Sequence, residues 1–154
     1  MSVERNLYIR ILTNLDGFSD IIKILIDNGF CFNSDRTITS LEENDVDDFN
    51  YIDFKSFEIV KKILDKREES GQSNSIVMMN YDINERFIIR SVKLANYYSK
   101  YRGHYEINFD IGHGIRISGA ERYTDFGSYL NKIIPIFVKN NIYICEVKCS
   151  DYDC

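Results

Sequence analysis

Apolar and polar residues are arranged along this chain in two distinct periods. Over residues 6–13 the apolar side chains largely fall at every second position, which is typical of a strand with one buried face. Over residues 16–28 and 56–69 they recur at every third or fourth position, which is typical of amphipathic helices. Gly29 follows the first of these segments at the position where helices commonly end. These segments therefore predict one strand and two helices in the first half of the chain.

The remaining segments predict more strands and a third helix. Strands are expected over residues 30–32, 75–80, 86–94, 104–111, 114–118 and 142–148, and a helix over 123–139. The periodicity after residue 86 is mixed, so a helix reaching Tyr101 is the alternative there. Pro135 lies inside the third helix and is expected to kink or break it, because an interior proline costs a helix about 3 kcal/mol. Asp16 or Ser19 is expected to cap the first helix.

This order of elements favours the α+β class, with helices packed on one face of a mainly antiparallel sheet. Residues 9–32 and 115–144 both run strand, helix, Asn-containing turn, strand, which suggests a remote β-α-β duplication of the ferredoxin-like kind. The alternative is that two similar units converged on one hydrophobic template. A length of 154 residues fits a single domain, residues 1–154.

Composition indicates a cytoplasmic protein. No segment approaches the ~18 apolar residues of a membrane span, and the first residues lack the apolar core of a signal peptide. Cys31, Cys145, Cys149 and Cys154 show no spacing of the disulfide-framework or zinc type. We therefore expect a reducing compartment, no membrane association, no metal and no cofactor.

Charge is unevenly distributed along the chain. The net charge of −5 comprises 12 acidic and 5 basic side chains in residues 1–58 (−7), and 12 acidic and 14 basic side chains in residues 59–154 (+2). An acidic half repels nucleic acid phosphates. It attracts and steers a basic protein partner instead.

One short motif raises an enzymatic alternative. Glu146-Val147-Lys148 follows the apolar residues 142–145 and resembles the E-x-K of the PD-(D/E)xK nucleases, with Asp110 as the upstream acid. The resemblance implies a carboxylate pair that holds a divalent metal and a lysine that assists the attacking water. The chain departs from the family pattern, because a strand and a long helix separate Asp110 from Glu146. The competing interpretation is an edge strand that shows alternating charges to water, and we expect no catalytic residues.

A second alternative is an RNA-binding or regulatory adaptor. Residues 86–102 contain five basic side chains and no acidic one, with tyrosines at positions 97, 98 and 101 and another just beyond at 105. Basic residues with stacking aromatics are typical of single-stranded RNA binding. The chain as a whole is acidic and lacks the basic pattern of an RNA-recognition motif. A surface that balances the acidic half is the simpler interpretation, and we do not expect nucleic-acid binding.

The acidic connection over residues 33–53 is the main candidate for a binding site. It places carboxylates around aromatic residues, and long ordered loops are often functional. Carboxylates around aromatic anchors suit a basic, partly apolar partner surface. The alternative is a solvated loop whose aromatics turn into the core. The expected partner-binding residues are Glu42, Glu43, Asp45, Asp47, Asp48, Tyr51 and Asp53.

In overall character, though not in any motif, the chain resembles the bacterial immunity proteins that neutralise secreted nuclease toxins, including those of contact-dependent inhibition. The shared features are small size, acidity, α+β pattern and the lack of a defensible catalytic site. The resemblance implies a stoichiometric inhibitor in the cytoplasm that covers a toxin's cationic active site with carboxylates. No family residues can be carried over.

Overall fold

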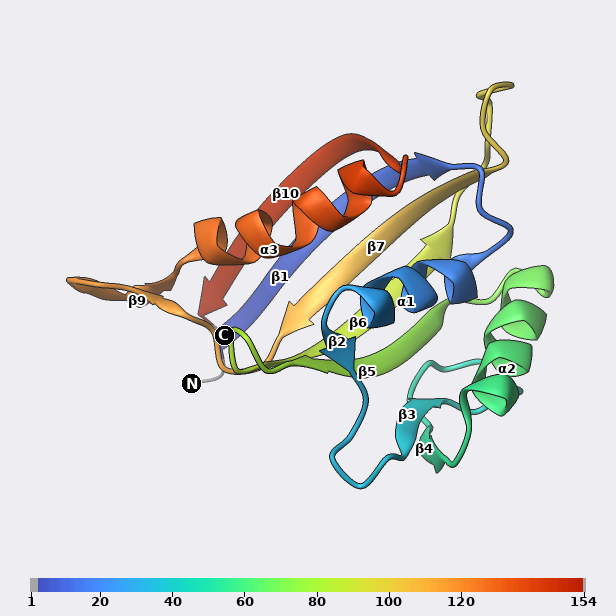
Figure 1. Cartoon of the computed structure of the whole chain (residues 1–154), viewed down its shortest axis with the longest axis horizontal. Coiled ribbons are helices and arrows are strands. Elements are labelled where there is room, and N and C mark those ends of the chain that lie inside the picture. Colours follow the sequence, from blue (N-terminus) through green and yellow to red (C-terminus); the bar gives the residue numbers. More distant parts are fainter. Residues whose placement is uncertain (1–2, 154) are drawn as a thin grey trace.

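The computed structural model describes residues 3–153, in which one large antiparallel sheet carries three helices on one face (Figure 1). The helices are α1 (Phe18–Asp27), α2 (Phe57–Glu69) and α3 (Phe126–Lys139). The strands are β1 (Val3–Thr13), β2 (Phe30–Cys31), β3 (Ile38–Leu41), β4 (Tyr51–Phe54), β5 (Asn74–Asn80), β6 (Glu85–Lys93), β7 (Gly103–Ile111), β8 (Arg116–Ile117), β9 (Ala120–Thr124) and β10 (Tyr143–Asp153). The predicted α+β class is confirmed.

The main sheet has the strand order β10-β1-β7-β6-β5-β3-β4, and β2 also pairs with β5. All of these pairs are antiparallel. Strands β8 and β9 form a separate hairpin, whose β9 end projects away from the main body (Figure 1).

The ferredoxin-like duplication is not confirmed. Residues 115–117 were its expected third strand, but they contribute to β8, which lies outside the main sheet. Two crossovers do interlock in the sheet, though they are made from other segments. The chain from β7 to β10 passes through α3 and crosses β1, which lies between these two strands. The chain from β1 to β6 passes through α1 and the segment from β2 to β5, and it crosses β7.

The core lies between the sheet and the helices. Alternate residues of β1, β7, β6 and β5 are fully buried on the helix side, as the period of two predicted. Phe87 on β6 packs edge-on against Phe109 and Tyr129, each with ring centroids 5.9 Å away. No helix among the described residues covers the opposite face of β10, β1, β7 and β6 (Figure 1). That face is called the open face below.

Tertiary packing, not local capping, begins α1. The N-cap is Gly17, which has no side chain to offer, and the N–H of Phe18 donates to the Glu68 carboxylate on α2 at 3.3 Å. The expectation that Asp16 or Ser19 caps the helix is therefore wrong. The Ser19 hydroxyl instead donates to Asp65 on α2 at 2.7 Å. Helix α1 does end as predicted, with Gly29 at φ 96° directly after its C-cap.

The third helix is shorter than predicted but is not interrupted. Residues 120–124 form β9, and α3 starts only after Asp125, whose carboxylate accepts the Ser128 N–H at 3.4 Å. The helix then continues through Pro135, where a kink or break was expected. The carbonyl that a proline leaves unpaired belongs to Asn131, an exposed residue, so water can solvate that carbonyl.

Two ambiguous segments are resolved by strand pairing. Strand β6 ends at Lys93 and residues 94–102 form a loop, so the alternative helix reaching Tyr101 is wrong. Residues 33–53 are not one long connection either. They contain β3 and most of β4, which pair as a hairpin around a shorter loop, residues 42–50, called the acidic loop below.

Candidate functional site

The acidic loop is built around a buried arginine of α2. The Arg67 side chain is completely buried and donates to the backbone carbonyls of Glu42 at 2.8 Å and Asp45 at 2.7 Å, and to that of Ser73 at 3.0 Å. Its remaining guanidinium nitrogen pairs with the half-exposed carboxylate of Asp48 at 2.9 Å. Since a buried guanidinium needs all of these acceptors, it fixes the path of the loop backbone.

Other carboxylates of the loop also have local partners. Asp45 accepts the backbone N–H groups of Asn50, Asp47 and Phe49, and these bonds, with Asn50 first, lower the pKa of its carboxyl below the usual value. Glu42 accepts a hydrogen bond from the Asn50 side chain. Glu43 pairs with Lys66 of α2 at 3.0 Å. The carboxylates therefore hold the loop in one shape, in addition to giving it negative charge.

The side chains that the loop leaves to solvent include two large apolar ones. Phe49 is 84% exposed and Val46 is 78% exposed. The Asp47 carboxylate is also exposed, and no described residue forms a hydrogen bond or ion pair with its side chain. Exposed apolar side chains on an ordered loop are a feature of protein interaction sites.

The other two predicted binding residues lie on β4 and face different neighbours. The Tyr51 hydroxyl lies 2.8 Å from the Ser75 hydroxyl on β5, and the ring is only partly exposed. Asp53 is exposed and accepts a hydrogen bond from Thr39 of β3. The structure thus brings the seven predicted residues to one hairpin, in which Phe49 is the most exposed aromatic residue.

An apolar groove of about 480 Å³ lies between the hairpin and α2. Ile52 and Phe54 of β4 line one wall, and Ile59 and Ile63 of α2 line the other. Glu42, Glu43 and Asn44 stand at its acidic end, and Lys62 lies on the helix.

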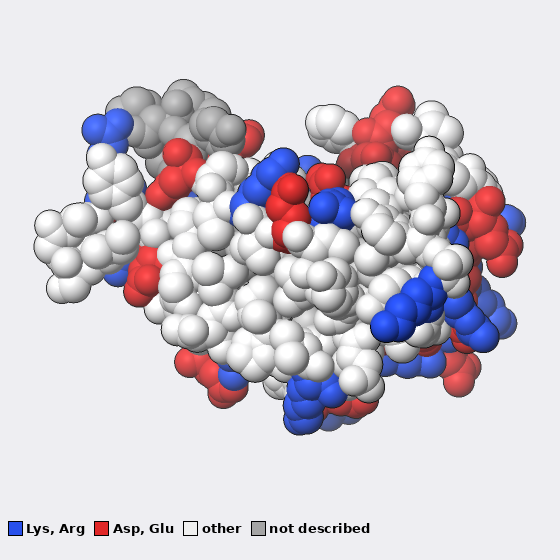
Figure 2. Space-filling view, turned by 90° about the horizontal axis from the view of Figure 1, so that it is seen from above, with Lys and Arg blue, Asp and Glu red and all other residues white. Residues whose placement is uncertain are grey.

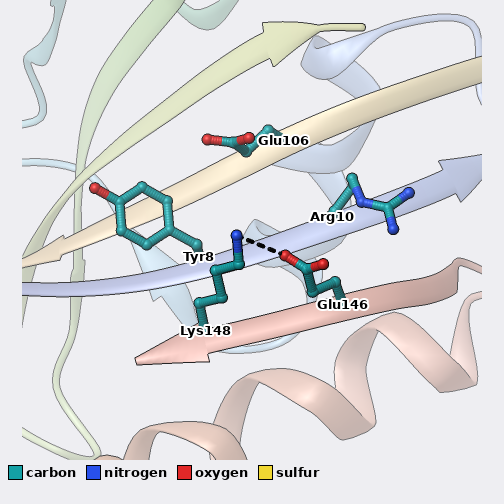
Figure 3. Close-up of a pocket in the computed structure, with 5 residues that line it drawn as sticks. All are labelled: Tyr8, Arg10, Glu106, Glu146 and Lys148. Atoms are coloured by element: carbon teal, nitrogen blue, oxygen red, sulfur yellow. Dashed lines mark ion pairs between the residues drawn. The ribbon is translucent and has the colours of Figure 1, made fainter. Parts of the chain in front are cut away.

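The open face holds a second cavity, of about 310 Å³, in a row of paired charges (Figure 3). Its residues come from three neighbouring strands: Tyr8 and Arg10 from β1, Glu106 from β7, and Glu146 and Lys148 from β10. Arg10 is in register with Glu106 on one side and with Glu146 on the other. The Lys148 ammonium lies 2.9 Å from the Glu146 carboxylate, a contact that lowers the pKa of Glu146 and raises that of Lys148. Opposite charges therefore largely compensate one another within this cavity.

Arg10 is already engaged within the sheet. Its guanidinium points away from Lys148 (Figure 3) and lies 3.1 Å from the Nε2 atom of His104. Because arginine can only donate, Nε2 must accept, and the His104 proton is then on Nδ1, which donates to the Ala95 carbonyl at 2.8 Å. His104 thereby links Arg10 to the loop over residues 94–102.

The nuclease-type residues are not brought together. Glu146 and Lys148 share the cavity, but Asp110 is in register with Asn6, and Asn6 with Ser150. Two strand spacings and four residues of rise separate the Cα atoms of Asp110 and Glu146 by about 16 Å. Asp110 is partly buried, which raises the pKa of its carboxyl, although Arg90 at 4.0 Å opposes this. Among residues 3–153, no group of three or more His, Cys, Asp or Glu side chains is arranged to hold a metal ion.

The basic, tyrosine-rich segment is divided between two places. Arg86 and Arg90 lie on β6, and Arg90 forms an ion pair with Asp110 of β7 at 4.0 Å. Tyr97 and Lys100 lie instead on the exposed loop over residues 94–102. Seen from above, basic and acidic side chains are intermixed rather than separated into large areas of one sign (Figure 2). The face seen in Figure 2 therefore shows no continuous cationic track of the kind that binds single-stranded nucleic acid.

Two features escaped prediction. The first is the burial of Arg67. Its helical spacing from Val60, Ile63 and Leu64 could have indicated this burial, because it places the arginine on the apolar stripe of α2. The cavity on the open face depends on Glu106, Arg10 and Glu146 being in register. No local pattern specifies that alignment, because it joins strands about 40 to 140 residues apart.

Comparison with protein-family models, with curated proteins and with solved structures found no match. None of the helices among the described residues has the length and apolar character needed to cross a membrane. Cys31, Cys145 and Cys149 are free thiols, and Cys154 lies outside the described residues.

Proposed function

We propose that this protein is a stoichiometric binding protein of the toxin-immunity kind, which engages a basic protein partner through the acidic loop. The observation that carries the proposal is the exposure of Phe49 and Val46 on a loop that Arg67 holds in place. A loop that is already ordered loses little conformational entropy on binding. Its carboxylates attract a cationic surface, and the exposed Phe49 ring supplies an apolar anchor.

The proposed role is inhibition by covering the cationic active site of a nuclease toxin in the cytoplasm. This role requires affinity and speed but no chemistry from the inhibitor. The nuclease alternative loses support from the separation of Asp110 from Glu146 and Lys148. The RNA-adaptor alternative loses support from the intermixed charges around Arg90.

The direct test is co-expression with the toxin encoded immediately upstream, together with kinetics on the purified complex. Phe49→Ala should raise the dissociation rate at least tenfold, because it removes the anchor. Asp47→Asn should mainly slow association and weaken its salt dependence, since this carboxylate is free for steering. Tyr97→Ala is the matched control, because Tyr97 is an equally exposed aromatic (89%) on another loop.

Wild-type kinetics in both loop variants would exclude the acidic loop as the interface. The absence of any upstream toxin gene would remove the immunity role while leaving partner binding open to test. Loss of binding in Tyr97→Ala alone would place the interface on the loop over residues 94–102.

A further inference from the structure

The groove between the β3-β4 hairpin and α2 has apolar lining residues that folding leaves partly exposed. Ile59 is 49% exposed and Ile52 is 37% exposed, although both are large aliphatic residues on regular elements. On α2 the core is filled by Val60, Ile63, Leu64 and Arg67. Ile59 lies next to this stripe, so folding does not bury it, and burial by a partner would contribute favourably.

The groove is continuous with the acidic loop. Glu42 and Glu43, the first residues of that loop, form one end of the groove. The Glu43 carboxylate is held by Lys66, and the segment over residues 42–53 contains six acidic side chains and no basic one. A ligand in this groove therefore meets an apolar lining, the carboxylates of Glu42 and Glu43 at one end, and Lys62 on the helix.

We infer that the groove receives one aliphatic or aromatic side chain from the partner, carried on a segment whose neighbouring residues are lysine or arginine. This inference rests on the proposed function and adds a second anchor point and the chemistry of the partner segment. A volume of about 480 Å³ accommodates a large side chain together with part of its backbone. The flanking cations complement the carboxylates of Glu42 and Glu43 and the excess of acidic side chains in the adjoining loop.

A peptide-display selection against the full chain tests the inference without knowledge of the natural partner. Random dodecapeptides selected on the wild-type protein should converge on one large apolar residue flanked by Lys or Arg. Synthetic versions of the selected peptides should bind Ile59→Asp at least tenfold more weakly than wild type. Val138→Asp is the matched control, since Val138 is an exposed aliphatic residue (62%) on α3, and it should bind like wild type.

Three results would contradict the inference, and they have different consequences for the proposed function. Selected peptides that bind Ile59→Asp normally, or that lack an apolar consensus residue, would overturn the inference. If they also bind normally to Phe49→Ala and Asp47→Asn, the proposed function fails with it; if they lose affinity only for those loop variants, the proposed function stands and the groove is excluded. Self-association of the unliganded chain that Ile59→Asp abolishes would identify a second copy as the occupant and would also contradict the inference.

Discussion

The acidic loop and the open-face cavity are both rich in charge, yet they use that charge in opposite ways. In the loop, carboxylates and carbonyls converge on Arg67 or on local N–H groups, and apolar side chains such as Phe49 remain exposed. In the cavity, Glu106, Arg10 and Glu146 follow one another across neighbouring strands in alternating sign. The first arrangement produces a fixed surface with an excess of negative charge, and the second produces a nearly neutral one.

This difference shows why acidic composition alone does not identify a binding site. A charge that is compensated by a cross-strand neighbour contributes little long-range field. A carboxylate that accepts backbone N–H bonds keeps its charge and also orders the chain, as Asp45 does. The loop therefore combines an ordered backbone, negative charge and an exposed aromatic ring. The cavity is also ordered, but its opposite charges largely cancel.

The largest expected effect is on Arg67. Arg67→Met should lower the free energy of unfolding by about 3 kcal/mol or more, because the carbonyls of Glu42 and Asp45 would lose a buried charged donor. Urea denaturation measures the loss, and amide exchange should show a disordered loop. Lys66→Met is the control on the neighbouring residue, whose ammonium is exposed, and it should have a much smaller effect. Equal stability of Arg67→Met and wild type would show that Arg67 does not organise the loop.

A smaller, local effect is expected from the protonation of Asp45. Its pKa is lowered in the folded state, so its contribution to folding is present above the unfolded value of about 3.9 and is lost as the pH falls through the lower folded value. The amide resonances of Phe49 and Asn50 should therefore shift with acid, below the ordinary titration range of aspartate. Asp45→Asn should show perturbed Phe49 and Asn50 resonances already at neutral pH. Resonances that do not respond to either change would contradict a role for Asp45 in shaping the loop.

The smallest effect is expected on the open face. The Glu146–Lys148 pair is solvent-exposed, so Glu146→Gln should leave the thermal unfolding midpoint almost unchanged. The same variant tests the enzymatic alternative, since purified wild type and variant should show equal, background cleavage of RNA and DNA in Mg²⁺ or Mn²⁺. Cleavage that Glu146→Gln abolishes would show that the cavity is catalytic, and the open face, not the acidic loop, would then be the functional region.

Sequence periodicity predicted the elements whose signals are local. Strand β1, helices α1 and α2, and the three strands from β5 to β7 follow from spacing of apolar residues, and Gly29 correctly marked the end of α1. The acidic character of residues 42–53 was equally visible. In these segments the backbone geometry of a helix or strand decides which positions are buried, so the type of element can be predicted from residues that are close in sequence.

Tertiary structure alone decided the features that depend on distant residues. The Glu68 carboxylate of α2 satisfies the Phe18 N–H at the start of α1, and Arg67 turns a long acidic connection into a hairpin with an ordered loop. The alignment of Arg10 between Glu106 and Glu146 is likewise a consequence of strand register, and so is the separation of Asp110 from Glu146. Register is selected by burial of the whole helix-side face of the sheet at once, because a slip of one residue would expose that entire face. The sequence therefore determined which residues are acidic, apolar or helical, and the packing of the sheet determined which of them meet.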